Sequence, residues 1–115
     1  MALEAAFAAV TIGDGTARGV VCRAHARRLC EGHFPGEPIV PGAQLAGLMA
    51  ELAAALVAPT AALAALERCV FTARVTPEDE IVVSARRVAA TRVDAEVRRR
   101  GASAARATLR FRTEA

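Results

Sequence analysis

The apolar positions in the middle of the chain recur with the period of an α-helix. Large apolar side chains stand three or four residues apart at Leu45, Leu48, Met49, Leu52 and Leu56. This spacing places them on one face, so we predict a buried helix over residues 43–57. Pro59 and Thr60 follow, and they either end the helix or begin a second short helical piece over residues 60–65.

The second half of the chain changes to a period of two. Val93, Ala95 and Val97 alternate with charged residues. Alternation of this kind is typical of strands with one buried and one solvated face. With a turn at residues 76–79, strands are expected over residues 66–75, 80–89, 92–100 and 103–113. Four successive strands after one buried helix predict an antiparallel meander wrapped on that helix.

The beginning of the chain predicts a hairpin and then a long loop. Residues 3–10 and 16–24 have the composition of strands and flank the turn signal Gly13-Asp14-Gly15. Residues 25–42 are predicted to form a loop, and a loop of that length in a compact domain is usually functional. The elements together predict the α+β class and one domain over residues 1–115.

The loop before the helix is stiff and carries one imidazole, His33. Three prolines and three glycines occur in it: Gly32, Pro35, Gly36, Pro38, Pro41 and Gly42. Each proline fixes its own φ and pushes the preceding residue toward extended geometry, so this segment is not helical. The predicted helix follows from Gly42, and its first backbone amides lack internal partners at the positive end of the dipole. A carbonyl oxygen or an anion would bind there.

Residues His33 to Gly42 read His-Phe-Pro-Gly-Glu-Pro-Ile-Val-Pro-Gly. This segment resembles the active-site motif of the hotdog-fold 3-hydroxyacyl-ACP dehydratases of fatty acid synthesis, His-Phe-Pro-Gly-x-Pro-[Ile/Val]-[Met/Val]-Pro-Gly before a helix. Thr76-Pro77-Glu78-Asp79 stands where the family has a Pro-Gly-Asp turn, so the resemblance extends over nearly the whole chain. It implies the hotdog fold, in which an antiparallel sheet wraps around one long central helix.

The resemblance also implies a reaction and roles for residues. In the family, a 3-hydroxyacyl chain on phosphopantetheine loses water to give a trans-2-enoyl thioester, in a site that spans two subunits. By position, His33 is the catalytic base for the C2 proton, and the Gly42 N–H polarises the thioester carbonyl. Phe34 and Val40 would line the pocket or serve in packing. No cofactor is implied beyond the substrate's own carrier, which is acyl carrier protein (ACP) or CoA.

The acidic residue of the family motif is missing from this chain. It stands five residues after the final glycine, where this chain has Gly47. Helical spacing places Gln44 and Glu51 on the same face. Glu51 is a candidate catalytic acid, because a carboxylate on an apolar helix is costly unless it is paired or working; alternatively it meets an arginine or reaches water. Gln44 can position a hydroxyl without transferring a proton, and Gly47 leaves space for a bulkier acyl chain.

The charge of the chain is +3, and every basic residue is arginine. The run Arg98-Arg99-Arg100 would suit nucleic acid, but no aromatic platform accompanies it, so we interpret it as the solvated end of a strand. An arginine-rich rim would also steer an acidic carrier protein toward a site.

The cysteines and the hydropathy pattern bear on metals and on location. Cys22, Cys30 and Cys69 lack the spacing of metal ligands, so we expect free thiols and no metal. The N-terminus lacks a basic signal-peptide region, and Glu51 interrupts the apolar helix, so we expect a cytoplasmic chain without a membrane span.

Three functions remain open at this point. The first is a 3-hydroxyacyl-thioester dehydratase of fatty acid or polyketide type. The second is an acyl-thioesterase of the same fold that uses Glu51. The third is a non-catalytic acyl-binding chain that depends on a second hotdog subunit. In each case a small, alanine-rich core favours a homo-oligomer, at least a dimer.

Overall fold

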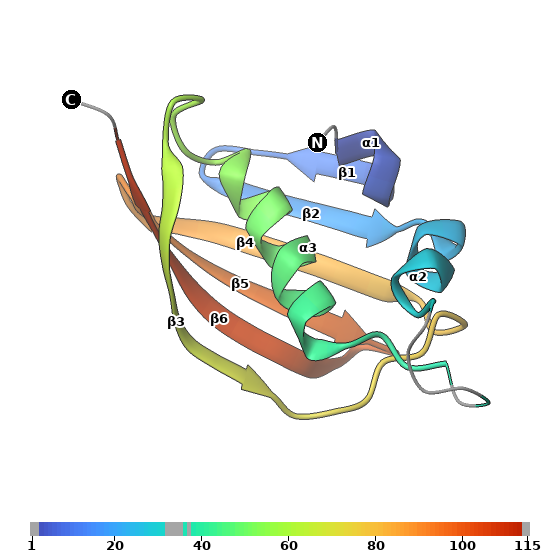
Figure 1. Ribbon diagram of the computed structural model, residues 1–115. Helices are drawn as coiled ribbons and strands as arrows, with labels where there is room; N and C mark the ends of the chain where they lie inside the picture. Colours follow the sequence, from blue (N-terminus) through green and yellow to red (C-terminus); the bar gives the residue numbers. More distant parts are fainter. Residues whose placement is uncertain (1–2, 32–35, 37, 114–115) are drawn as a thin grey trace.

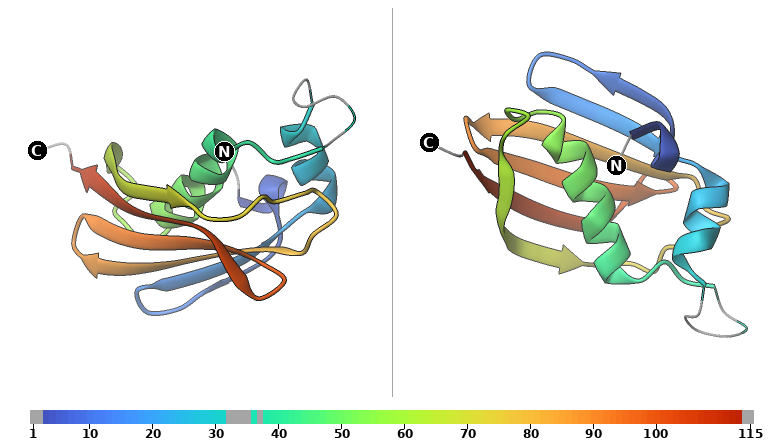
Figure 2. Two further views of the ribbon diagram at one scale, coloured as in Figure 1. Left: turned by 90° about the horizontal axis from the view of Figure 1, so that it is seen from below. Right: turned by 45° about the horizontal axis from the view of Figure 1, so that its top comes forward.

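A curved sheet around one helix organises the molecule. The computed structural model describes residues 3–31, 36 and 38–113 of the chain. Helix α3 (Gly42–Ala54) lies across one face of a six-stranded antiparallel sheet (Figure 1), and the sheet curls around it (Figure 2). The strands are β1 (Phe7–Ile12), β2 (Thr16–Val21), β3 (Ala62–Phe71), β4 (Ile81–Ala89), β5 (Arg92–Arg99) and β6 (Ala102–Arg112). This arrangement confirms the predicted α+β hotdog fold.

The strand order is β1-β2-β4-β5-β6-β3. Strands β4, β5 and β6 form a meander, as predicted, but β3 pairs with β6 at the far edge. The prediction of one four-stranded meander is therefore wrong for β3. Side-chain alternation indicates that a segment is a strand, but it does not indicate which backbone the strand will pair with.

The hairpin near the N-terminus is confirmed, but two helices flank it that the sequence did not predict. Residues Leu3–Ala6 form helix α1, and the first strand begins only at Phe7. Helix α2 (Arg23–Leu29) replaces the first part of the predicted long loop. Both segments are rich in alanine, leucine and other good helix formers, and that propensity decides their structure.

The alanine-rich segment after α3 is a strand rather than a second helical piece. Strand β3 begins at Ala62 and ends at Phe71, four residues before the predicted end. Its residues pair with β6 along their length, with two register shifts. Pairing with a neighbouring strand overrides the helix propensity of alanine here.

The core lies between α3 and the sheet. The five apolar positions predicted to face inward from the helix region are all buried. They belong to one cluster with buried strand residues, among them Val83, Val93, Val97 and Leu109. The apolar faces of the helix and of the strands thus pack into a single core, as the pattern predicts.

Candidate functional site

The start of helix α3 presents free backbone amides. Pro41 is the N-cap and is extended, and no side chain caps the helix. The Pro41 carbonyl accepts hydrogen bonds from the N–H groups of Gln44, at 2.9 Å, and Leu45, at 3.1 Å. Within the described residues, no group accepts from the N–H of Gly42 or Ala43. These two amides are therefore available to a carbonyl oxygen.

The segment that leads into α3 is tied to the chain after β3. The Val40 N–H donates to the Val75 carbonyl at 2.7 Å, and both residues are buried. Val40 therefore holds the position of the helix start by packing and by this hydrogen bond. Its predicted alternative roles were pocket lining or packing, and its burial agrees with packing.

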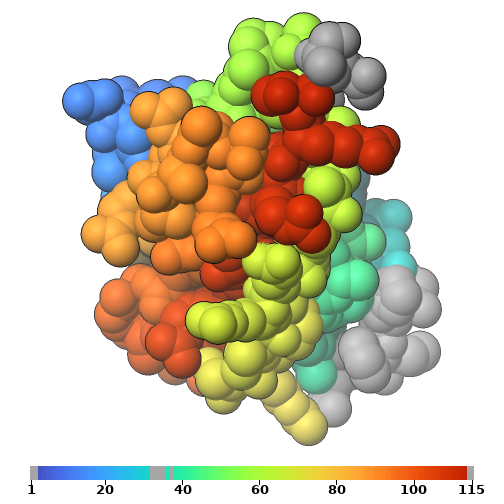
Figure 3. Space-filling view, turned by 90° about the vertical axis from the view of Figure 1, so that its left-hand side faces the viewer, coloured from blue at the N-terminus to red at the C-terminus, as the bar shows by residue number. Residues whose placement is uncertain are grey.

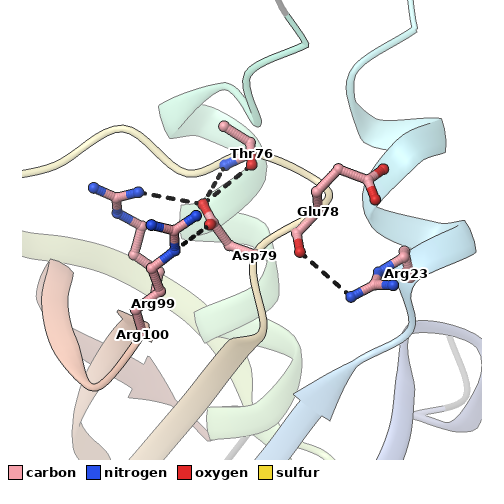
Figure 4. Close-up of polar contacts among 6 residues, drawn as sticks. All are labelled: Arg23, Thr76, Glu78, Asp79, Arg99 and Arg100. Carbon is pink, nitrogen blue, oxygen red and sulfur yellow. Dashed lines mark hydrogen bonds and ion pairs between the residues drawn. The ribbon is translucent and has the colours of Figure 1, made fainter.

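A buried carboxylate fixes the turn between β3 and β4 (Figure 4). The side chain of Asp79 is 2% exposed. It accepts from the Thr76 N–H and hydroxyl, both at 3.1 Å, from Arg100 Nε at 3.0 Å and from an Arg99 guanidinium nitrogen at 3.4 Å. Burial raises the pKa of Asp79, but the bonds from Thr76 and Arg99 and the charge of Arg100 outweigh it, so the pKa lies below its ordinary value of 3.8.

These contacts correct part of the interpretation of the arginine run. The run does stand at the end of a strand, since β5 ends at Arg99. Arg100 is solvated, with 77% of its side chain exposed, but Arg99 is only 33% exposed, and both also bind Asp79. The tight β5–β6 turn allows this, since Arg100 and Gly101 both have positive φ, at 51° and 76°.

The neighbouring residue of the turn is tied to helix α2. Arg27 donates to both carboxylate oxygens of Glu78, with a shortest distance of 2.9 Å. Arg23 donates to the Glu78 carbonyl at 3.3 Å (Figure 4). Residues 76–79 are thus held from α2 on one side and from the β5–β6 turn on the other, and Val75 next to them holds Val40.

Phe71 is a site residue that the sequence analysis missed. Its ring lies against Gly42, since a Cβ at position 42 would be 3.2 Å from Cζ of Phe71. The side chain is 48% exposed, although it is large and apolar. Nothing in the sequence signals the contact, because it joins the end of an edge strand to the start of the preceding helix.

The outer face of α3 carries the remaining predicted residues. Gln44 and Gly47 are exposed, and a Cβ at position 47 would meet no atom within 4 Å. Glu51 is half-buried, and its Oε2 is buried without a hydrogen-bond partner among the described residues. Of the two alternatives for Glu51, a pairing with an arginine is not seen within the part of the chain that the structure describes.

Two predicted residues, His33 and Phe34, lie outside the described residues. Their roles remain predictions. The other histidine, His25, lies in α2 and is half-buried.

Burial makes two of the three thiols poor nucleophiles. Cys22, Cys30 and Cys69 are free, as expected. Burial raises the pKa of the Cys30 and Cys69 thiols above the ordinary value of 9.0. Both thiols are therefore protonated at neutral pH, and protonated thiols are poor nucleophiles.

A groove on the sheet lies away from this site. The groove has a volume of about 830 Å³ and is lined by Ser84, Glu96 and Arg106 among others. These three residues stand opposite one another and alternate with the buried residues that face α3. The groove is therefore on the outer face of the sheet, away from the helix amides.

No helix of the described residues is long and apolar enough to span a membrane.

Comparison with solved structures identifies the fold independently. The Dehydratase Heterocomplex ApeI:P from Xenorhabdus doucetiae contains a similar chain, with a TM-score of 0.74 and 16% identity over 86% of this chain and 88% of that one. PH1136 from Pyrococcus horikoshii gives a TM-score of 0.74 and 21% identity over 90% and 78%. Cj0977 from Campylobacter jejuni, described as a sigma28-regulated virulence protein, gives 0.77 and 12% over 99% and 80%.

Comparison of the sequence itself gives the family. None of the curated proteins matches the chain. The sequence model of the ApeI-like family, described as ApeI dehydratase, matches residues 14–108, which is most of the chain and includes α3 and the loop before it. The chain therefore belongs to the ApeI-like dehydratase family.

Proposed function

We propose that this protein is a 3-hydroxyacyl-thioester dehydratase that forms a trans-2-enoyl thioester. The observation that carries the proposal is the pair of amides at Gly42 and Ala43, which have no acceptor among the described residues, in a chain of a dehydratase family. Negative charge develops on the thioester oxygen when the C2 proton leaves, and preorganised amides stabilise that charge. The substrate is of fatty acid or polyketide type, carried on ACP or CoA.

His33 acts as the base in this proposal. An imidazole has an ordinary pKa near 6.5, which suits proton transfer at neutral pH. It takes the proton from C2, and the electron pair moves toward the carbonyl held by Gly42. The C3 hydroxyl then leaves as water after it receives a proton.

Glu51 supplies the acid that position 47 lacks. Its Oε2 is buried and has no hydrogen-bond partner in the part of the chain that the structure describes, which supports this role, because an uncompensated carboxylate oxygen is costly to bury. Exposed Gln44, one turn before position 47, orients the hydroxyl. Gly47 leaves open space beside them for the acyl chain.

The active unit is at least a dimer, formed along strand β3. This strand is an edge of the sheet and is open to the viewer beside β6 in Figure 3. It exposes Leu63, Leu66 and Val70, by 45%, 39% and 47%. A long apolar edge strand in a stable protein is normally covered, and pairing with a second chain covers it.

A carrier protein would approach over the arginine-rich rim. Arg27 and Arg100 are exposed by 58% and 77%, and Arg23 and Arg28 are also exposed. Only the first two of these four have an acidic side chain as partner within the described residues. The rim therefore favours an acidic partner, such as ACP.

The decisive assay offers 3-hydroxybutyryl and 3-hydroxydecanoyl thioesters and follows enoyl product and free thiol together. We expect enoyl product, which His33→Ala abolishes. Free thiol without enoyl product would instead identify an acyl-thioesterase, with Glu51 as its carboxylate. The absence of both products with every chain length would refute catalysis by the isolated chain.

A second candidate is a partner subunit that needs another hotdog chain. The open space at Gly47 favours it, because the family acid is absent there. The similar structure described as a heterocomplex offers a precedent for assembly from two kinds of chain. Gly47→Glu separates the candidates: a partner subunit gains activity on its own, whereas a self-sufficient enzyme is already active without the change.

A further inference from the structure

We propose that Phe71 determines the specificity of this site by excluding acyl groups that branch at C2. The inference rests on the proposed function, because that function places the thioester carbonyl on the Gly42 amide. It adds a substrate class, namely thioesters with an unbranched C2.

The ring of Phe71 meets helix α3 end-on at the first residue of the helix. A Cβ at position 42 would lie 3.2 Å from Cζ and 3.3 Å from Cε1 and Cε2, which together are the tip of the ring. Phe71 is the last residue of β3 and pairs with Ala105 of β6. The strand therefore fixes the backbone that carries the ring, and the residue is 48% exposed.

The substrate would pass directly beside this ring. A carbonyl oxygen bound by the Gly42 N–H lies about 2.9 Å from the nitrogen. C2 is two bonds from that oxygen, and the proposal places it beside the ring tip, on the side of Gly42 where a Cβ would meet Phe71. A methylene at C2 needs little room there, whereas a methyl branch needs the volume that the ring occupies.

The expected discrimination is measurable. One methyl group in a closely packed pocket changes kcat/KM by roughly 10–200-fold. We therefore expect the protein to prefer 3-hydroxybutyryl- over 2-methyl-3-hydroxybutyryl-N-acetylcysteamine by at least about tenfold. Phe71→Ala should reduce this preference by about the same factor, mainly by raising kcat/KM for the branched substrate. An unchanged preference would overturn the proposal.

Two further variants keep the test clear. Val88→Ala removes a similarly exposed apolar side chain from β4, near the opposite end of α3, where Arg87 donates to the Leu56 carbonyl, and it should leave the preference unchanged. If Phe71→Ala does not fold, Phe71→Leu keeps an apolar side chain but removes the ring tip beside Gly42. A smaller loss of the preference for the unbranched substrate is then expected.

Binding decides the proposal if the protein turns over neither substrate. In that case the proposed function fails, but the exclusion of C2-branched acyl groups by Phe71 can still be tested. The chain has no tryptophan, so Phe71→Trp places a single fluorophore beside Gly42. Butyryl-N-acetylcysteamine should change its emission at about tenfold lower concentration than the 2-methylbutyryl thioester, and Val88→Trp should not respond. Equal responses, or none from Phe71→Trp, would overturn the proposal.

Discussion

At the residue scale, Asp79 and Glu78 show how burial changes the contribution of a carboxylate–arginine contact to stability. Both carboxylates bind arginines in one turn, but Glu78 is 60% exposed and Asp79 is 2% exposed. An exposed ion pair contributes about 0–1 kcal/mol, because water competes for both charges. A buried carboxylate whose hydrogen bonds are removed leaves several donors without their acceptor, which costs more.

The first prediction follows from this pair. Asp79→Ala should lower the free energy of unfolding by about 2–3 kcal/mol, and Glu78→Ala by less than about 1 kcal/mol. Urea denaturation of the two variants and the parent protein at neutral pH measures both values. Equal losses would show that the Asp79 contacts are not the stronger ones.

The lowered pKa of Asp79 adds a pH dependence. The folded protein holds the carboxylate ionised more strongly than the unfolded chain, whose pKa is near 3.8. The stabilisation is therefore complete well above pH 3.8 and is lost as the pH falls through the lower, folded value. In acid titrations of stability, Asp79→Asn should lack this part of the decline.

Glu51 is the second residue for which the chemistry can be tested. Glu51→Gln keeps the shape but removes the proton that the acid would donate. We expect kcat for dehydration to fall by about 10²–10⁴-fold, as is typical when a general acid is lost. The free energy of unfolding should be unchanged or higher, because Oε2 is buried without a partner among residues 3–31, 36 and 38–113. Full activity of the variant would assign Glu51 a purely structural position.

At the scale of the element, replacing glycine by alanine should have opposite effects on stability in α3 and in the β5–β6 turn. Gly47 lies inside a helix with open space around it, so Gly47→Ala should stabilise the protein by about 0.5–1 kcal/mol. Gly101 has a φ of +76°, where a side chain is strained, so Gly101→Ala should destabilise it by about 1–2 kcal/mol. Thermal or urea unfolding measures both changes. If both variants gain stability, or both lose it, the explanation from the two backbone conformations is wrong.

At the scale of the whole molecule, strand β3 is expected to hold two chains together. Leu66→Arg places a charge in the exposed apolar edge and should give a monomer with little activity, because the proposed site spans two subunits. Val88→Arg is the matched control, since Val88 is also exposed, by 45%, but lies on β4 inside the sheet order. Sedimentation analysis gives the mass. A Leu66→Arg variant of the same mass as the parent protein would exclude this edge as the interface.

Much of the fold is visible in the sequence because periodicity reports directly on burial. The helical spacing of Leu45, Leu48 and Leu52 and the alternation through Val93 and Val97 both follow from which side chains avoid water. The errors lie where local propensity and long-range pairing compete. Helix α2 was not predicted because its residues adjoin a loop of prolines and glycines. The pairing of β3 was predicted wrongly because its partner strand is distant in sequence.

The sequence by itself determined the family, the loop motif and the free amides at the start of α3. These are local properties, set by proline, glycine and the helix that follows them. Only the tertiary structure decided that Val75 holds Val40, that Asp79 gathers Arg99 and Arg100, and that Phe71 stands against Gly42. Each of these contacts joins segments far apart in the chain, and their approach depends on how the sheet closes around the helix rather than on any local pattern.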